Sequence, residues 1–175
     1  MTMKWLTLKL LPCCLAIGLC LATAGHVHAQ KTGGEKAVRA TVQRFFSLLK
    51  TRQYQALYDF LPLQFQKQTT REQLTASLRR LDDFLVIEKM EVGRIQQRDD
   101  LAVVDTVIHG RLKRPVNVQG REIQQGRVSS QQYLIREEGK WKIATADNRS
   151  QQLFLQQHPE VKQYFQLTRP QWGVN

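Results

Sequence analysis

The sequence predicts an α+β protein in which three N-terminal helices precede a run of antiparallel strands. Three observations carry this prediction. Apolar residues recur at helical steps between residues 34 and 85, the apolar period changes to two after Val86, and the strand region ends in a hairpin. A chain of 175 residues fits one such domain.

An export signal is predicted at the N-terminus. Lys4 and Lys9 precede an apolar run from Leu10 to Ala24, and Val27-His28-Ala29 meets the requirements of a signal peptidase. We expect cleavage after Ala29, so that residues 1–29 form a signal peptide and the mature protein is periplasmic or secreted. The membrane is then a partner only during export.

Three alternatives for this segment are weaker. A cut after Ala24 would leave almost no polar stretch before it, and an uncleaved anchor would need ~20 apolar residues. Lipid attachment at Cys20 is disfavoured because the bulky Leu19 precedes it.

Cysteine usage limits the chemistry of the mature chain. All the cysteines lie in the predicted signal peptide: Cys13, Cys14 and Cys20. The mature chain therefore has no disulfide, no thiol nucleophile and no thiolate metal site. It also lacks the His-Glu-x-x-His, Gly-x-Ser-x-Gly and dinucleotide-binding motifs, and we predict neither a metal site nor a cofactor.

The first two helices are predicted from their caps and stops. Thr32 and Glu35 have the capping-box spacing, which predicts a helix from about residue 34 to residue 51. A second, short helix should follow and stop at Pro62, because the residue before a proline is disfavoured in helical conformation. Its apolar side consists of Tyr54, Leu57, Tyr58 and Leu61.

The third helix has the clearest signal. Thr69 and Thr70 precede Glu72 and Gln73 at capping-box spacing. The leucines that follow recur at steps of four, three and four: Leu74, Leu78, Leu81 and Leu85.

The strand region begins with a weak strand over residues 87–97 and a turn at Asp99-Asp100. Residues 101–112 form a long strand with apolar side chains on both faces, and residues 115–126 read as a polar loop or an irregular hairpin end. Arg127 resumes the strand pattern.

A tight hairpin closes the strand region. Two apolar runs flank Glu137-Glu138-Gly139-Lys140, where the glycine supplies the positive φ of a tight turn. In the tail, Pro159-Glu160 predicts the start of a short helix. Four apolar tail residues could pack on the sheet, cover a cavity mouth or join a dimer interface, and we favour the first: Phe154, Tyr164, Phe165 and Trp172.

This order of elements resembles the nuclear transport factor two-like superfamily, also called ketosteroid-isomerase-like or SnoaL-like. The segments that carry the resemblance lie within residues 35–147 and read AVRATVQRFFSLLKTRQYQALYDFLP, DDLAVVDTVIHG and REEGKWKIATAD. The resemblance implies a cone-like fold, in which the three helices pack in the concave face of a curved antiparallel sheet around an apolar cavity. We assign residues 30–147 to this domain and residues 148–175 to a C-terminal extension packed on it.

The resemblance leaves function open, because the superfamily includes isomerases, dehydratases and non-catalytic binding modules. Asp105 and His109 form the sharpest catalytic candidates. They share a strand face and could line the cavity, where burial would make the aspartate a proton acceptor. The alternative, which we favour, turns Ala102, Val104, Thr106 and Ile108 inward instead.

Two further residue sets are candidates for binding. The predicted pocket wall consists of Tyr54, Tyr58, Val103, Val107 and Tyr133. A basic stretch suits an anionic partner, although a solvated strand edge is the simpler interpretation. Its members are Arg111, Lys113, Arg114, Arg121 and Arg127. Because aromatic residues for base stacking are missing from this stretch, we do not expect a nucleic-acid partner.

We expect an exported, non-catalytic module that binds an apolar small molecule or an envelope protein, with a homodimer as one arrangement to test. The alternatives are a small cofactor-free isomerase or dehydratase that uses Asp105 and His109, and a basic binder of anionic envelope surfaces.

Overall fold

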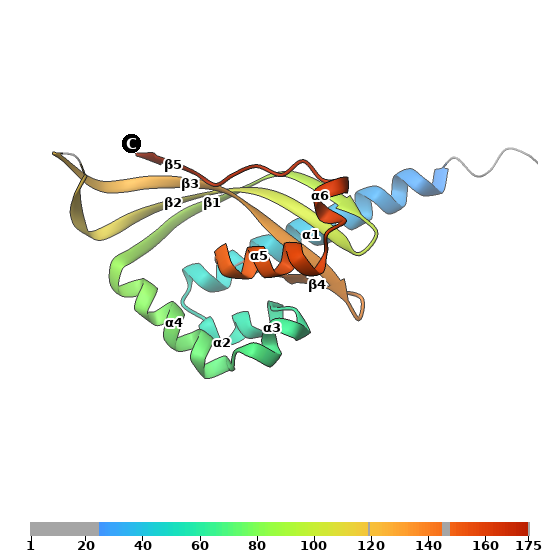
Figure 1. Cartoon of the computed structure of the whole chain (residues 1–175), viewed down its shortest axis with the longest axis horizontal. Coiled ribbons are helices and arrows are strands. Elements are labelled where there is room, and N and C mark those ends of the chain that lie inside the picture. Colours follow the sequence, from blue (N-terminus) through green and yellow to red (C-terminus); the bar gives the residue numbers. More distant parts are fainter. Residues whose placement is uncertain (1–24, 119, 145–147, 175) are drawn as a thin grey trace, which may run out of the picture.

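The fold is α+β, with the helices of the N-terminal half packed on one face of a long antiparallel sheet (Figure 1). The computed structural model describes residues 25–118, 120–144 and 148–174. Most of the predicted signal peptide and the end of the predicted domain, residues 145–147, lie outside this part. None of the helices in the described part is long and apolar enough to span a bilayer.

The helical half supplies one wall of the molecule. It contains, in chain order, α1 (Gly25–Lys50), α2 (Tyr54–Leu57), the 3-10 helix η1 (Tyr58–Phe60), α3 (Leu63–Gln68) and α4 (Arg71–Phe84).

The sheet and its cover follow. The remaining elements are β1 (Leu85–Arg98), β2 (Leu101–Val118), β3 (Arg121–Glu137), β4 (Lys140–Ile143), α5 (Asn148–Gln157), α6 (Val161–Tyr164) and β5 (Gln171–Val174). Strand order is β1-β2-β3-β4, and β5 also pairs with β3, so β3 has β2 along one edge and both β4 and β5 along the other.

The predicted start of the first helix was wrong. The backbone is helical from Gly25, so Thr32 lies inside α1 rather than at its end. Ala29, Gln30 and Lys31 favour helix, and this local preference extends the helix past the Thr-Gly-Gly sequence. A cut after Ala29 would fall within the first turns of α1.

The capping box predicted for the third helix is confirmed for α4. The Thr70 hydroxyl accepts a hydrogen bond from the Gln73 backbone at 3.2 Å, and the Gln73 side chain accepts one from the Thr70 backbone at 2.9 Å. Both bonds satisfy amides that the helix itself leaves unpaired. α3 was not predicted, because its short apolar pattern follows Pro62, which we took as a stop.

Residues 115–126, predicted as a polar loop or an irregular hairpin end, form an irregular hairpin end. β2 and β3 pair as far as Val118 and Arg121, with a register shift between Arg111 and Val116. At the tip the Asn117 side chain accepts a hydrogen bond from the Gly120 amide at 2.9 Å, and Gly120 has a φ of +80°. The predicted Glu138-Gly139 turn is confirmed, with positive φ at both residues.

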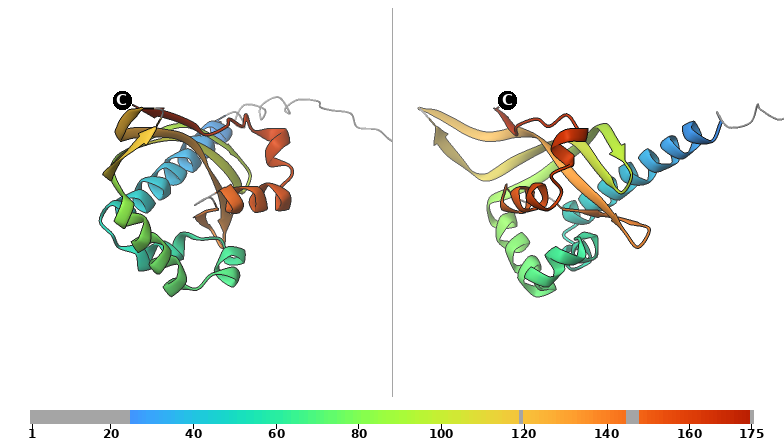
Figure 2. Two further views of the ribbon diagram at one scale, coloured as in Figure 1. Left: turned by 60° about the vertical axis from the view of Figure 1, so that its left-hand side comes forward. Right: turned by 45° about the vertical axis from the view of Figure 1, so that its right-hand side comes forward.

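The sheet has an inner face, which contacts α1, α2 and α4, and an outer face, which the C-terminal segment covers. Figure 2 shows the sheet curving around α1, with α5 and α6 on its other side. The inner-face cluster joins Val38, Val42 and Leu57 of the helices to Ala102 and Val104 of β2.

A second buried cluster covers the outer face. It joins Val103 and Tyr133 of the sheet to Phe154, Val161 and Phe165 of the C-terminal segment. Phe154 stacks on Tyr133 with ring centroids 5.8 Å apart. The tail is therefore part of the core, although α5 and β5 were not predicted.

Candidate functional site

The predicted catalytic pair lies on the outer face of the sheet, away from the helices. Alternate residues of β2 point to opposite faces, and Ala102, Val104 and Ile108 contact the inner-face cluster. Asp105 and His109 therefore point outward, as the favoured alternative predicted, and the hypothesis that they line the cavity is wrong. Periodicity alone did not decide which side of the strand faces the helices, because apolar residues occupy both sides.

Asp105 binds two of the side chains that hold the C-terminal segment on the sheet. It accepts hydrogen bonds from Arg94 Nε at 3.2 Å and from Gln131 Nε2 at 2.8 Å. Gln131 also donates to the Gln166 carbonyl at 3.0 Å and accepts from the Thr168 amide at 2.9 Å. The carboxylate of Asp105 is thus occupied by structural contacts. We call the network formed by Asp105, Gln131 and the segment around Gln166 the glutamine clasp.

The glutamine clasp has a second half on β1. Gln96 accepts a hydrogen bond from the Gln166 amide at 2.9 Å and donates to the Gln166 carbonyl at 3.2 Å. Arg94 Nη1 donates to Gln166 Oε1 at 2.7 Å. The segment after α6 is therefore bound across β1, β2 and β3.

His109 is paired with a surface carboxylate. Its Nε2 lies 3.3 Å from Glu91 Oε1, a contact without hydrogen-bond geometry. Lys89 Nζ binds the same oxygen at 2.8 Å, and this hydrogen bond is the main reason why the pKa of Glu91 is lowered.

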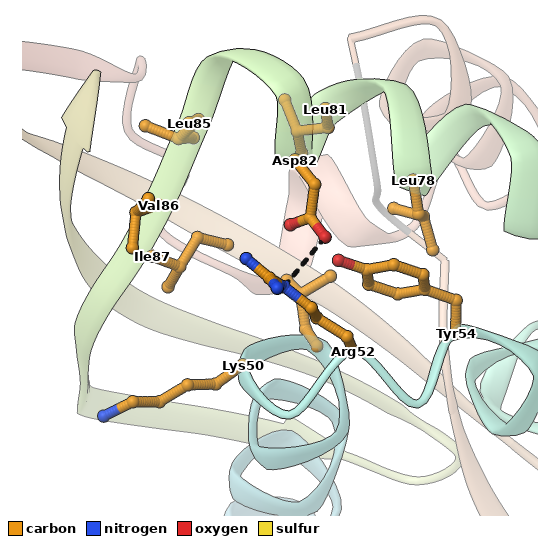
Figure 3. Close-up of a pocket in the computed structure, with 10 residues that line it drawn as sticks. Lys50, Arg52, Tyr54, Leu78, Leu81, Asp82, Leu85, Val86 and Ile87 are labelled. Atoms are coloured by element: carbon orange, nitrogen blue, oxygen red, sulfur yellow. Dashed lines mark ion pairs between the residues drawn. The ribbon is translucent and has the colours of Figure 1, made fainter. Parts of the chain in front are cut away.

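Tyr54, the first residue of α2, belongs to a polar cluster that joins α4 to the turn between α1 and α2 (Figure 3). Arg52 Nε lies 3.0 Å from Asp82 Oδ2, and the Tyr54 hydroxyl donates to the same carboxylate. Burial, followed by this hydrogen bond, raises the pKa of Tyr54 to about 12. The adjoining hollow has a volume of about 40 Å³, room for only a few waters. We interpret the cluster as a structural contact that stabilises the packing of α2 against α4.

The other predicted pocket residues also have structural roles. Tyr58 donates to the Gln66 carbonyl at 2.9 Å, and Tyr133 accepts from Gln151 Nε2 at 2.8 Å. Burial raises the pKa of Tyr133. Val103 and Val107 point to the outer face with Asp105. None of these residues lines the large cavity described next, and Tyr54 lines only the small hollow beside it.

A cavity of about 460 Å³ opens between the helices and the inner face of the sheet. This volume is typical of small-molecule sites, which occupy roughly 300–1,000 Å³. α1 and α4 contribute Phe45, Phe46, Leu49, Leu78 and Leu81. The sheet contributes Leu85, Ile87, Ile108, Leu112, Ile123 and Val128, and β5 contributes Trp172 and Gly173.

The polar part of the cavity wall comes from neighbouring strands. Gln132 Nε2 donates to Thr106 Oγ1 and to Ser130 Oγ, each at 3.3 Å, and Thr106 Oγ1 donates to the Ser130 carbonyl at 3.1 Å. Gln132 and Ser130 line the cavity, together with Gln124 and Gln125. These groups can orient a ligand by hydrogen bonding, but they do not titrate near neutral pH.

Acid–base groups are absent from the described lining, which contains no aspartate, glutamate, histidine, tyrosine or lysine, and Arg127 is its only charged residue. The described part of the chain also contains no group of three or more acidic, histidine or cysteine side chains placed to hold a metal ion.

The predicted basic residues cluster on the β2–β3 hairpin. Arg111 Nε lies 3.3 Å from Glu88 Oε1. The other four have no ion pair within the described residues: Lys113, Arg114, Arg121 and Arg127.

Helices on the inner face of a curved antiparallel sheet, with an apolar cavity between them, are the arrangement that the resemblance implied. The fold is nuclear transport factor two-like. This assignment rests on element order, sheet topology and the position of the cavity.

The solved structures to which this chain is similar include two that are described as NTF2-like. A protein described as an NTF2-like transpeptidase from Campylobacter jejuni is 10% identical, with a TM-score of 0.39 over 60% of this chain and 94% of its own. An NTF2-like protein with a cystatin-like fold from Novosphingobium aromaticivorans is 13% identical, with a TM-score of 0.42 over 77% and 98%.

A third structure, described as a calcium/calmodulin-dependent protein kinase II association domain from Xanthomonas campestris, is 20% identical, with a TM-score of 0.37 over 61% of this chain and 79% of its own. At these identities and scores the superpositions carry no functional argument. No family model matches the sequence, and no curated protein matches it.

The residues that sequence reasoning missed are those of the cavity wall. Phe45 and Phe46 were not singled out, Leu78 was expected only on the apolar side of the third helix, and Trp172 was expected to pack on the sheet. The even-numbered positions of β2 carried the signal, because Ile108, Gly110 and Leu112 all face the cavity.

Proposed function

We propose that this protein is an exported binding protein for an apolar small molecule, which it holds in the inner-face cavity. The fold supports either a small-ligand-binding or an isomerase-like domain. The observation that favours binding is the composition of the cavity: a mostly apolar wall, a glutamine and serine patch, and no carboxylate or imidazole in the described lining.

Catalysis at Asp105 and His109 has less support. An isomerase of the expected kind needs its proton acceptor within hydrogen-bond reach of the substrate. Here the carboxylate lies on the opposite side of the sheet from the cavity and binds Arg94 and Gln131.

Binding can be tested with N-phenyl-1-naphthylamine, a neutral probe whose fluorescence rises in apolar surroundings. We expect saturable binding with one site per chain, and Ile108→Phe should weaken it because the larger side chain takes up part of the cavity. Val107→Phe is the matched control, because the adjacent residue points to the outer face. Equal effects of the two substitutions, or no saturable binding, would overturn the proposal.

Export is supported by the leader sequence and can be tested separately. When the full reading frame is expressed, we expect the mature protein in an extracytoplasmic fraction with Gln30 at its N-terminus. An unprocessed chain in the cytoplasmic fraction would contradict export, but it would leave the binding proposal intact.

A further inference from the structure

The wall of the cavity continues into the basic hairpin, by which we mean the paired ends of β2 and β3 over residues 111–118 and 120–127. Ile123, Gln124 and Gln125 of this hairpin line the cavity, and Arg127 borders it where β3 meets β5. In Figure 1 the hairpin extends beyond the end of α4 at which β1 begins. One end of the cavity therefore lies beneath a strand that carries cations.

Most cations on the basic hairpin form no ion pair with the described residues. Arg111 pairs with Glu88, whereas Lys113, Arg114, Arg121 and Arg127 have no ion pair among the described residues. Glu122 is the hairpin's only acid.

Geometry connects these cations to the apolar wall. Arg121 precedes Ile123 by two residues on one strand, so the two side chains share a face. Arg127 pairs with Gly173 of β5, and its side chain packs on that glycine, on the opposite face of the sheet from the neighbouring Val128 and Trp172. A group leaving the cavity beside Ile123 would therefore meet the guanidinium group of Arg121.

Apolar side chains also surround this opening. Trp172 is 82% exposed and Leu81 is 42% exposed, and both line the cavity. Exposed apolar groups of this size around a pocket are typical of binding sites. The opening therefore offers both an apolar border and uncompensated positive charge.

We infer that the ligand is a single-chain amphiphile with an anionic head, whose alkyl chain occupies the cavity and whose carboxylate or phosphate lies against the basic hairpin. This inference rests on the proposed binding function and names its ligand class. Burial of the chain provides affinity, about fourfold for each added methylene. The cations add preference for a charged head, and salt should weaken this preference because the hairpin is exposed to solvent.

A polyanion or an anionic membrane fits the structure less well. Either partner would use the basic residues, but neither would use the apolar cavity at their base. The combination of an apolar cavity and a basic hairpin therefore favours an amphiphile with an anionic head.

The test compares decanoate, decyl phosphate and decanol, each below its critical micelle concentration, as competitors of N-phenyl-1-naphthylamine. The protein is expressed from the full reading frame and purified in the form that the cell produces. We expect both anions to compete on the order of tenfold better than decanol in low salt. A difference between the two anions would distinguish a carboxylate head from a phosphate head.

A charge-removal variant connects this preference to the hairpin. It replaces four cations by glutamine: K113Q, R114Q, R121Q and R127Q. A control variant removes the same charge from exposed positions outside the cavity wall: K36Q, R44Q, K67Q and K162Q. The hairpin variant should bind the anions and decanol about equally well, and the control should keep the preference.

The outcomes separate this inference from the function on which it rests. Equal binding of anions and decanol by the natural protein would overturn the anionic head and leave the apolar ligand intact. Absence of binding by all three compounds and the probe would overturn both proposals. Binding to anionic vesicles that the hairpin variant loses, without competition by any single-chain compound, would replace the ligand with a membrane surface and overturn this inference.

Discussion

The two faces of the sheet are covered in different ways, and the difference separates stability from binding. On the outer face Phe154, Val161 and Phe165 fill the space over Val103 and Tyr133. The inner face is covered by helices that leave about 460 Å³ unfilled. The packed face tolerates little change in volume, whereas the open face can accommodate a ligand or a larger side chain.

Polar contacts follow the same division. On the outer face the glutamine clasp joins Gln96, Gln131 and Gln166 across three strands, and most of its donors and acceptors pair with one another. On the inner face Gln132 and Ser130 line the cavity, where a ligand can reach them. The first set fixes the chain, and the second can contribute to recognition.

The largest expected effect is loss of the outer-face cover. Phe154→Ala should lower the free energy of unfolding by about 3–5 kcal/mol, because the side chain is 1% exposed and stacks on Tyr133. Urea denaturation measures the change. Phe84→Ala, at a residue that is 69% exposed, should cost no more than about 0.5 kcal/mol. Similar losses in the two variants would remove the distinction between packed and exposed sites.

The second prediction compares the faces directly. Val103→Phe adds volume to the packed outer face and should destabilise the protein by about 1–3 kcal/mol. Ile108→Phe adds volume beside the cavity, so it should cost less stability while it weakens binding of the neutral probe. Thermal unfolding and probe titration of both variants provide the test. Greater destabilisation by Ile108→Phe would show that the inner face is not the looser one.

The third prediction concerns alkaline pH. The pKa of Tyr54 is raised to about 12, whereas an unfolded tyrosine titrates near 10. The folded state therefore holds the proton more tightly, and its contribution to stability is present below pH ~10 and lost as the pH rises toward 12. Burial of Tyr133 acts in the same direction.

Urea midpoints measured between pH 9 and 12 should fall less steeply in Tyr54→Phe than in the natural protein. At neutral pH the same substitution should cost about 1 kcal/mol, because Asp82 loses a hydrogen bond. Tyr164→Phe, at an exposed tyrosine, is the control and should keep the original slope. An unchanged slope in Tyr54→Phe would contradict the assigned contribution.

The smallest effect is expected for Asp105→Asn. The carboxylate is partly exposed and binds Arg94 and Gln131, so its conversion to an amide should cost less than about 1 kcal/mol. Probe affinity should not change, because the residue lies on the opposite side of the sheet from the cavity. A large loss of probe binding with unchanged stability would show that Asp105 contributes to the binding site.

Local signals were sufficient for most of the fold. The Thr70–Gln73 capping box, the change of period after Val86 and the Glu138-Gly139 turn each depend on neighbouring residues, and the α+β class with helices before an antiparallel sheet is confirmed. β5 could not be predicted in this way, because its pairing with β3 depends on residues far away in the chain.

The site was harder to predict, because it depends on which face of β2 points inward. The strand has apolar side chains on both sides, and both faces are in fact covered, so periodicity alone could not choose between Asp105 and Thr106 as the inward residue. The outer cover that makes Val103 a buried residue consists of α5 and α6, and α5 gave no recognised signal.

α5, α6 and the segment that carries Gln166 follow β1 to β4 in the chain, and this order determines when the outer face of the sheet is covered. A ribosome makes β1 to β4 before it makes Phe154 or Gln166, so the nascent sheet has one uncovered apolar side until synthesis has passed these residues. A stop codon within this segment would release a chain with that side open, which is the kind of surface that chaperones and proteases recognise.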